Sequence, residues 1–171
     1  MRAAQVLRHG PPGVITIDDV PRPQAGARQL LVRVKAAGVG NWDALIRERK
    51  VPLQPLPLIL GTELSRVVEG LGAGVVGFKL GDEVYGATNE QFSGAYAEYA
   101  VPLAGMVAQL PRAPTFIEVN QITELFNGGK LAMNVGTLLS LQEARVAHEA
   151  LAERRHHRGN IVLSVDSSAV G

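Results

Sequence analysis

The chain has 171 residues, of which 46% are hydrophobic and 19% charged, a composition typical of a globular protein that buries one core. Its formal net charge of +1 gives no electrostatic reason to expect nucleic acid or an anionic membrane as a partner. The absence of cysteine excludes disulfides, a thiolate nucleophile and a four-cysteine zinc site. Because there is no apolar run of about 18 residues and no signal-peptide core after Met1, we expect a cytoplasmic protein without a membrane span.

The N-terminal part of the sequence predicts antiparallel strands. Apolar and polar residues alternate over residues 14–19 and 30–36, which is the period of a half-buried strand. A turn at Gly38 and Gly40 then breaks the pattern, and Asn41 is placed to cap a short helix. Strands of this kind suit a small, partly open barrel. Further strands are expected at residues 1–7, 67–71, 84–85, 94–101, 106–110 and 161–165.

Two more helices are predicted toward the C-terminus. Apolar residues recur at helical spacing from Val119 to Phe126, and two glycines follow as a stop signal. Ser140 begins the second helix, because Ser140 and Glu143 form a capping box in which each satisfies a free N–H group of the other. The predicted buried stripe of this helix consists of Ala144, Ala147, His148 and Leu151.

One glycine pattern imitates a nucleotide-binding motif. Gly72, Gly74 and Gly77 satisfy G-x-G-x-x-G, but that fingerprint requires a helix directly after the last glycine. Phe-Lys-Leu-Gly-Asp follows Gly77, and Gly81 would stop a helix within one turn. We therefore interpret residues 72–77 as an array of β-turns between two strands.

Five segments of the chain, taken in the order in which they occur, match the pattern of a known protein family. They read VKAAGVGNWDALIR, LPLILGTE, VVEGLGAGVVGFKLGDEVYG, GAYAEYAV and LLSLQEARVAHEALAERRHHRGNIVLSV. This set resembles the catalytic, GroES-like domain of the medium-chain dehydrogenase/reductase superfamily, and within it the zinc-independent quinone oxidoreductases. The resemblance implies a mainly β (α+β) fold, a GroES-like and partly open β-barrel with two or three helices.

In the resembled family, a nucleotide-binding Rossmann domain separates the N-terminal catalytic segment from the C-terminal helices. Five βαβ-type units of about 30 residues each would need about 150 residues. Here the N-terminal segment, residues 1–113, is followed after a splice at residues 114–119 by the C-terminal part, residues 120–171. We therefore predict one catalytic domain over residues 1–171 with no Rossmann domain and no bound cofactor. NADPH is implied by the resemblance alone.

The same comparison argues against catalytic zinc. Zinc-dependent members of the superfamily use a cysteine and a Gly-His-Glu corner, and the corresponding positions here are Gly40 and Thr62. The histidines give no alternative metal site, since His156 and His157 are adjacent and point apart on any regular element.

The resemblance places the substrate pocket around one loop and two nearby positions. Trp42, the sole tryptophan, either packs against the core or lines this pocket, because its loop faces the nicotinamide in the family. Asp43 and Arg47 match the family pattern, although a local i,i+4 pair worth a few tenths of a kcal/mol would also explain them. Quinone oxidoreductases often carry polar side chains at Gly40 and Leu45, and both are missing here. The predicted pocket residues are Gly40, Asn41, Trp42, Asp43, Thr62 and Tyr85.

Two charged residues follow the corner formed by Gly61 and Thr62, and each needs its own interpretation. Glu63 is the acid expected from the family, and we interpret it as structural. Arg66 stands where the family usually has a glycine, which allows closer packing than an arginine. We expect Arg66 either to turn into solvent or to fill space left by the missing domain.

The resemblance implies an NAD(P)H-dependent, zinc-independent reductase of quinones or activated enones, in which the protein orients and polarises the substrate. The first hypothesis is the catalytic domain of such an enzyme, inactive or nearly so alone. The second is a binding or self-assembly module, such as a homodimer, that uses the surface exposed by loss of the Rossmann domain. The loop around Trp42 and the helix bearing Ile122, Leu125 and Phe126 are its candidate surfaces. The third hypothesis is that the Rossmann domain was deleted by accident and that the remaining chain has no evolved function.

Overall fold

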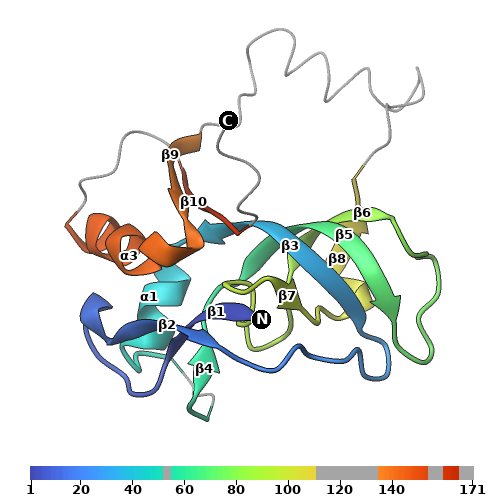
Figure 1. The fold of residues 1–171 in the computed structure, drawn as a ribbon, viewed down its shortest axis with the longest axis horizontal. Coiled ribbons are helices and arrows are strands. Elements are labelled where there is room, and N and C mark those ends of the chain that lie inside the picture. The colour runs from blue at the N-terminus through green and yellow to red at the C-terminus, as the bar shows by residue number, and fades with distance from the viewer. Residues whose placement is uncertain (52–54, 111–134, 154–159, 166–171) are drawn as a thin grey trace, which may run out of the picture.

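The computed structural model describes residues 1–51, 55–110, 135–153 and 160–165 (Figure 1). The predicted splice at residues 114–119, the predicted helix from Val119 to Phe126, and the pair His156 and His157 lie outside these residues. No helix in the described ranges is long and apolar enough to cross a membrane.

A small antiparallel sheet carries the N-terminus. Its strand order is β2-β1-β4, formed by β1 (Arg2–Val6), β2 (Ile15–Asp19) and β4 (Leu58–Ile59). A short 3₁₀ helix, η1 (Pro12–Val14), leads from the turn into β2. The strands predicted over residues 1–7 and 14–19 are confirmed.

The larger sheet has seven strands in the order β8-β6-β5-β3-β10-β9, with β7 beside β3. Both sheets stay open in the described residues, so the predicted mainly β, GroES-like architecture is confirmed as an open arrangement. The strands are β3 (Leu30–Val39), β5 (Glu63–Leu71), β6 (Glu83–Ala87), β7 (Tyr99–Ala100), β8 (Val107–Gln109), β9 (Val135–Ser140) and β10 (Asn160–Ser164). The short 3₁₀ helix η2 (Ala104–Met106) precedes β8.

Strand β3 pairs both with strands from the N-terminal segment of the chain and with the C-terminal strand β10. It pairs with β5 over residues 30–37 and with β7 over residues 32–33, and its last residues pair with β10, as Ala36↔Ser164 and Val39↔Ile161. The predicted turn at Gly38 is therefore wrong, because the strand continues through it. A Cβ on Gly38 would lie 2.6 Å from the Glu63 carboxylate, so glycine at this position makes room for that side chain instead.

The C-terminal part is a β-α-β unit that the sequence indicated only partly. Strands β9 and β10 are parallel, and η3 (Leu141–Glu143) and α3 (Ala144–Ala152) connect them. Strand β9 was not predicted. The capping box is confirmed, since the Glu143 Oε2 atom accepts hydrogen bonds from the N–H of Ser140 at 2.8 Å and from its hydroxyl at 2.7 Å. The buried stripe of α3 is confirmed at Ala144, Ala147 and His148.

Helix α1 (Asn41–Arg47) follows β3 directly and lies beside α3 (Figure 1). One apolar core joins residues from β1, β3, β5, α1, α3 and β10, so α1 and α3 close the same core from one side. Val39 at the end of β3 is buried in this core, whereas Asn41 and Trp42 at the start of α1 are exposed.

Residues 72–77 and residues 94–101 differ in how well they were predicted. Residues 72–77 form the predicted turn between β5 and β6, and no helix follows Gly77. The strand predicted over residues 94–101 is mostly wrong, since only Tyr99–Ala100 pairs as a strand. Ala95, Tyr96 and Ala97 are all buried, so this segment lacks the two alternating faces that the prediction assumed.

Candidate functional site

The site begins where β3 ends and α1 starts. Gly40 is the N-cap of α1, and Asn41 is the first helical residue rather than the cap that the sequence predicted. The carboxylate of Asp43 accepts a hydrogen bond from the Gly40 N–H at 2.9 Å through its Oδ2 atom. Asp43 thus satisfies one of the N–H groups that a helix start leaves open.

The second oxygen of Asp43 meets the Gly-Thr corner. The Thr62 hydroxyl lies 3.1 Å from Asp43 Oδ1 and 3.1 Å from the carbonyl oxygen of Phe92, so its single hydrogen is shared between two acceptors. Asp43 is only 2% exposed, and this burial raises its pKa, while the hydrogen bonds from Gly40 and Thr62 work against the rise. Asp43 is therefore a buried carboxylate that ties the helix start to the corner.

Tyr96 lies behind this pair. A Cβ on Gly61 would sit 2.3 Å from the Tyr96 ring, and Gly61 has a φ of +100°, so only glycine fits at this corner. Burial, and then the charge of Asp43, raise the pKa of Tyr96 well above its ordinary value. The Tyr96 hydroxyl and the Asp43 carboxylate interact, so Tyr96 belongs to the same buried polar cluster as Asp43 and Thr62.

Arg47 at the other end of α1 is fully buried and holds α3. Its guanidinium donates to the carbonyl of Gly10 at 3.1 Å and to Nδ1 of His148 at 3.1 Å, and it pairs with Glu48. Because arginine only donates, His148 carries its proton on Nε2, and burial followed by the Arg47 charge lowers the His148 pKa to about 3. The local Asp43–Arg47 pair is therefore wrong, since each side chain bonds to a distant segment.

The exposed part of the site is aromatic. Trp42 is 43% exposed, and its ring meets Phe92 edge to face with centroids 5.7 Å apart. The interpretation of Trp42 as a core residue is wrong, because its indole stands partly in solvent. Asn41 is exposed beside it in the first turn of α1.

The predicted pocket residues fall into two groups. Gly40, Asp43 and Thr62 are joined by hydrogen bonds, and Asn41 and Trp42 lie on the same helix start. Tyr85 is 49% exposed on β6, opposite Ser65, and has no described contact with the others. Phe92 was not among the predicted site residues, because it lies in a polar loop without a periodic pattern.

The turn at Gly72 does not fit the pyrophosphate of a dinucleotide. A Cβ on Gly72 would lie 1.7 Å from the carbonyl oxygen of Gly26, so this glycine packs backbone on backbone instead of forming a cradle. At the two positions that correspond to zinc ligands in the zinc-dependent relatives, Gly40 has no side chain and the Thr62 hydroxyl contacts Asp43 and Phe92. Among residues 1–51, 55–110, 135–153 and 160–165, no cluster of His, Asp or Glu side chains could hold a metal ion.

The fold is that of a GroES-like domain in which Gly40, Asp43 and Thr62 form a small hydrogen-bonded cluster beside the exposed ring of Trp42. A family model described as "Alcohol dehydrogenase GroES-like domain" matches residues 26–112. The chain belongs to this family, within the medium-chain dehydrogenase/reductase superfamily.

Relatives and solved structures agree with this assignment. Human quinone oxidoreductase is 35% identical over 118 residues, which cover 68% of this chain and 35% of that protein. A mycobacterial protein solved in complex with NADPH matches with a TM-score of 0.61 and 30% identity, over 82% of this chain and 45% of that one. An NAD-dependent alcohol dehydrogenase at 19% identity has a TM-score of 0.80 over 97% of this chain and 100% of that one, a likeness of fold alone. The chain thus spans about a third of the length of the quinone oxidoreductases that it matches.

Proposed function

We propose that this chain is the substrate-binding catalytic domain of a zinc-independent, NAD(P)H-dependent reductase of quinones or activated enones. The observation that carries the proposal is the half-exposed Trp42, held edge to face by Phe92 beside the Asp43–Thr62 corner. Similarity to human quinone oxidoreductase supports the substrate class.

The geometry suits a flat, conjugated carbonyl compound. A quinone ring can pack on the exposed indole of Trp42, since aromatic rings gain both area burial and favourable quadrupole contacts. The exposed amide of Asn41 carries N–H donors for a substrate carbonyl in the first turn of α1. Asp43 serves as a positioning residue, because it fixes Gly40 and Thr62 relative to each other.

We further propose that residues 1–113 and 120–171 form this one domain without a Rossmann domain, and that the chain alone turns over little or no quinone. Gly72 packs directly against the backbone of Gly26, which supports the absence of a pyrophosphate site at this turn. We therefore derive no step through the dinucleotide. The cytoplasmic location stays a prediction.

Binding and turnover are tested separately. Menadione should shift the amide NMR signals of α1 saturably, and Asn41→Ala and Trp42→Leu should weaken this binding, whereas Val76→Ala, a change to an exposed side chain in the 72–77 turn, should not. NADPH oxidation with menadione should stay at the protein-free rate. If menadione shifts no α1 signal, the substrate proposal is wrong; if NADPH is consumed above background, the proposed loss of activity is wrong.

Self-association is the second candidate function, and one observation favours it. Strand β9 ends the larger sheet in the described part of the chain, carries no charged residue, and exposes Val135 and Leu138 by 50% and 58%. Uncharged edge strands are prone to pair with another strand. Sedimentation should then show a dimer that Leu138→Lys disrupts and Leu80→Lys, at a site 63% exposed, does not. A monomer at all concentrations would exclude the homodimer.

A further inference from the structure

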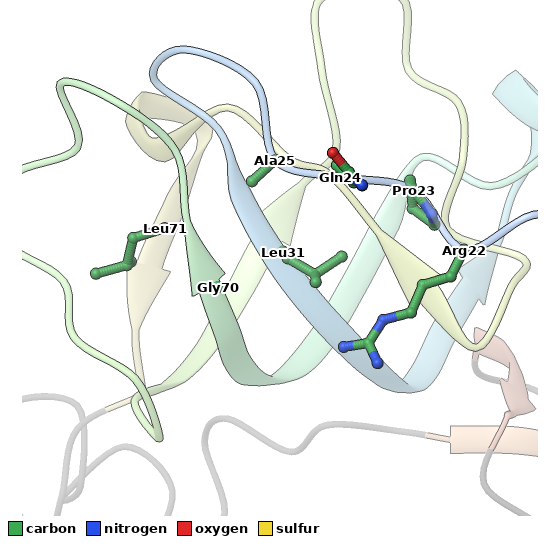
Figure 2. A pocket seen from close by; sticks show the side chains of 7 residues that line it. All are labelled: Arg22, Pro23, Gln24, Ala25, Leu31, Gly70 and Leu71. Atoms are coloured by element: carbon green, nitrogen blue, oxygen red, sulfur yellow. The ribbon is translucent and has the colours of Figure 1, made fainter.

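A pocket far from the Trp42 corner lies between the chain entering β3 and the outer side of the larger sheet. Figure 2 shows residues 23–25 running along one side of it, with Leu31 projecting from β3 and Leu71 from β5. Leu31 and Val39 are eight positions apart on β3, so the pocket lies roughly 25 Å from the start of α1. It is therefore separate from the site of the proposed function.

The size and lining of the pocket suit a small, flat molecule. Its volume is about 450 Å³, within the range of ligand sites in proteins. Leu31, Leu71, Pro23 and Ala25 supply apolar surface, and the Leu31 side chain packs closely against Gly70, 3.1 Å from where a Cβ would lie. Apolar contact alone would accept many ligands, so the polar groups at the rim decide which class binds.

Of the residues that line the pocket, Arg22 is the charged one, and Glu69 and Arg33 lie next to it outside the lining. Arg22 Nη2 lies 2.8 Å from Glu69 Oε2, and Arg33 Nε lies 2.9 Å from Glu69 Oε1, so two arginines share one carboxylate. This cluster carries a net charge of +1 and retains guanidinium N–H groups beyond these two contacts. Arg22 is also held over the ring of Tyr99, with its Cζ atom 3.8 Å from the ring centroid, which orders it before any ligand arrives.

Backbone donors add to the rim. The N–H groups of Gln24 and Ala25 form no hydrogen bond to any described residue, although the neighbouring Gly26 N–H is bonded to the Gln29 side chain at 2.9 Å. Two prolines, Pro21 and Pro23, restrict the backbone that presents these donors. The segment at residues 23–25 therefore offers two N–H groups without a partner among the described residues, in addition to the guanidinium of Arg22.

We propose that this pocket binds a small amphipathic anion, with an aromatic or aliphatic body against Leu31 and Leu71 and a carboxylate near Arg22. Charge complementarity selects an anion, and the apolar lining selects against fully polar ones such as inorganic phosphate. The arginines are about half exposed, so salt screens the attraction and binding is weak.

The test is an amide NMR titration with naphthoate and with the uncharged naphthalene methanol. Naphthoate should produce saturable shifts at Gln24, Ala25, Gly70 and Leu71, and should bind more tightly than the alcohol. Arg22→Gln should weaken naphthoate about fourfold and leave the alcohol unchanged, as expected for one exposed charge contact. Added salt should act like Arg22→Gln.

The control is a matched pair of substitutions. Leu71→Glu should weaken both ligands about tenfold because it places a charge in the apolar lining, whereas Leu80→Glu, outside the pocket, should change neither. The proposal is wrong if naphthoate does not saturate, if its shifts centre on α1, or if Arg22→Gln weakens both ligands equally. Equal losses in Leu71→Glu and Leu80→Glu would also overturn it.

Discussion

Replacing Arg66 with glycine should stabilise the protein. Arg66 has a φ of +151° inside β5, where it pairs with Val34 on one side and Val84 on the other. The register of β3 against β5 shifts at this point, between Val34 and Ala36. A side chain in this backbone region costs about 2 kcal/mol, because it is essentially a glycine conformation. The extra freedom of glycine in the unfolded chain offsets about 1 kcal/mol of that relief.

Arg66→Gly should therefore raise the free energy of unfolding by about 1 kcal/mol, and the Tm by about 3 °C for a chain of this size. Urea denaturation followed by circular dichroism measures the first, and calorimetry the second. Arg66→Ala should gain nothing, because its Cβ keeps the strain.

Lys35→Gly is the matched control. Lys35 is an exposed cationic residue on β3 without a positive φ, so glycine there should cost about 1 kcal/mol. If Arg66→Gly loses as much stability as Lys35→Gly, the backbone at Arg66 is not strained and the reasoning is refuted.

Three further predictions concern buried groups. The folded-state pKa of His148, about 3, lies below its ordinary 6.5, so its stabilising contribution is complete above pH 6.5 and is lost as the pH falls toward 3. By about pH 5 the loss should reach about 2 kcal/mol, and His148→Gln should show that much less acid sensitivity in urea denaturation; equal slopes would contradict this. Asp43→Ala should cost about 2 kcal/mol by leaving the Gly40 N–H without its acceptor and removing one of the two acceptors of the Thr62 hydroxyl, and Asp43→Asn should cost less. Gly72→Ala should cost about 3 kcal/mol because a backbone atom occupies the Cβ position, whereas Gly13→Ala, which meets open space, should change stability by less than about 0.5 kcal/mol; equal effects would contradict the packing argument.

The sequence predicted elements whose signals are local. Alternation gave the N-terminal strands, and the Ser140–Glu143 spacing gave the start of the C-terminal helical segment, because each signal acts within one turn or one strand. Strand β9 was missed because Val-Gly-Thr-Leu-Leu-Ser has no alternation, and its pairing depends on β10 about 20 residues later.

Predictions about the site met the same limit, because its contacts join segments that are far apart in the sequence. The family resemblance drew attention to Asp43 and Arg47, and their i,i+4 spacing offered a local pair as the other explanation. Their partners are Thr62 and His148, the latter 101 positions away from Arg47, and no local pattern reports such a contact. Trp42 could not be placed either, because its exposure depends on Phe92 in a loop without regular structure.

The position of β10 has a consequence for how this protein is made. Residues 36–39 of β3 emerge from the ribosome well before residues 160–164, which are their hydrogen-bonding neighbours on that side. During this interval the nascent chain displays an open strand edge at Ala37 and Val39, both apolar. Synthesis that stalls before Asn160 would leave that edge free to pair with another nascent chain, so such fragments should aggregate.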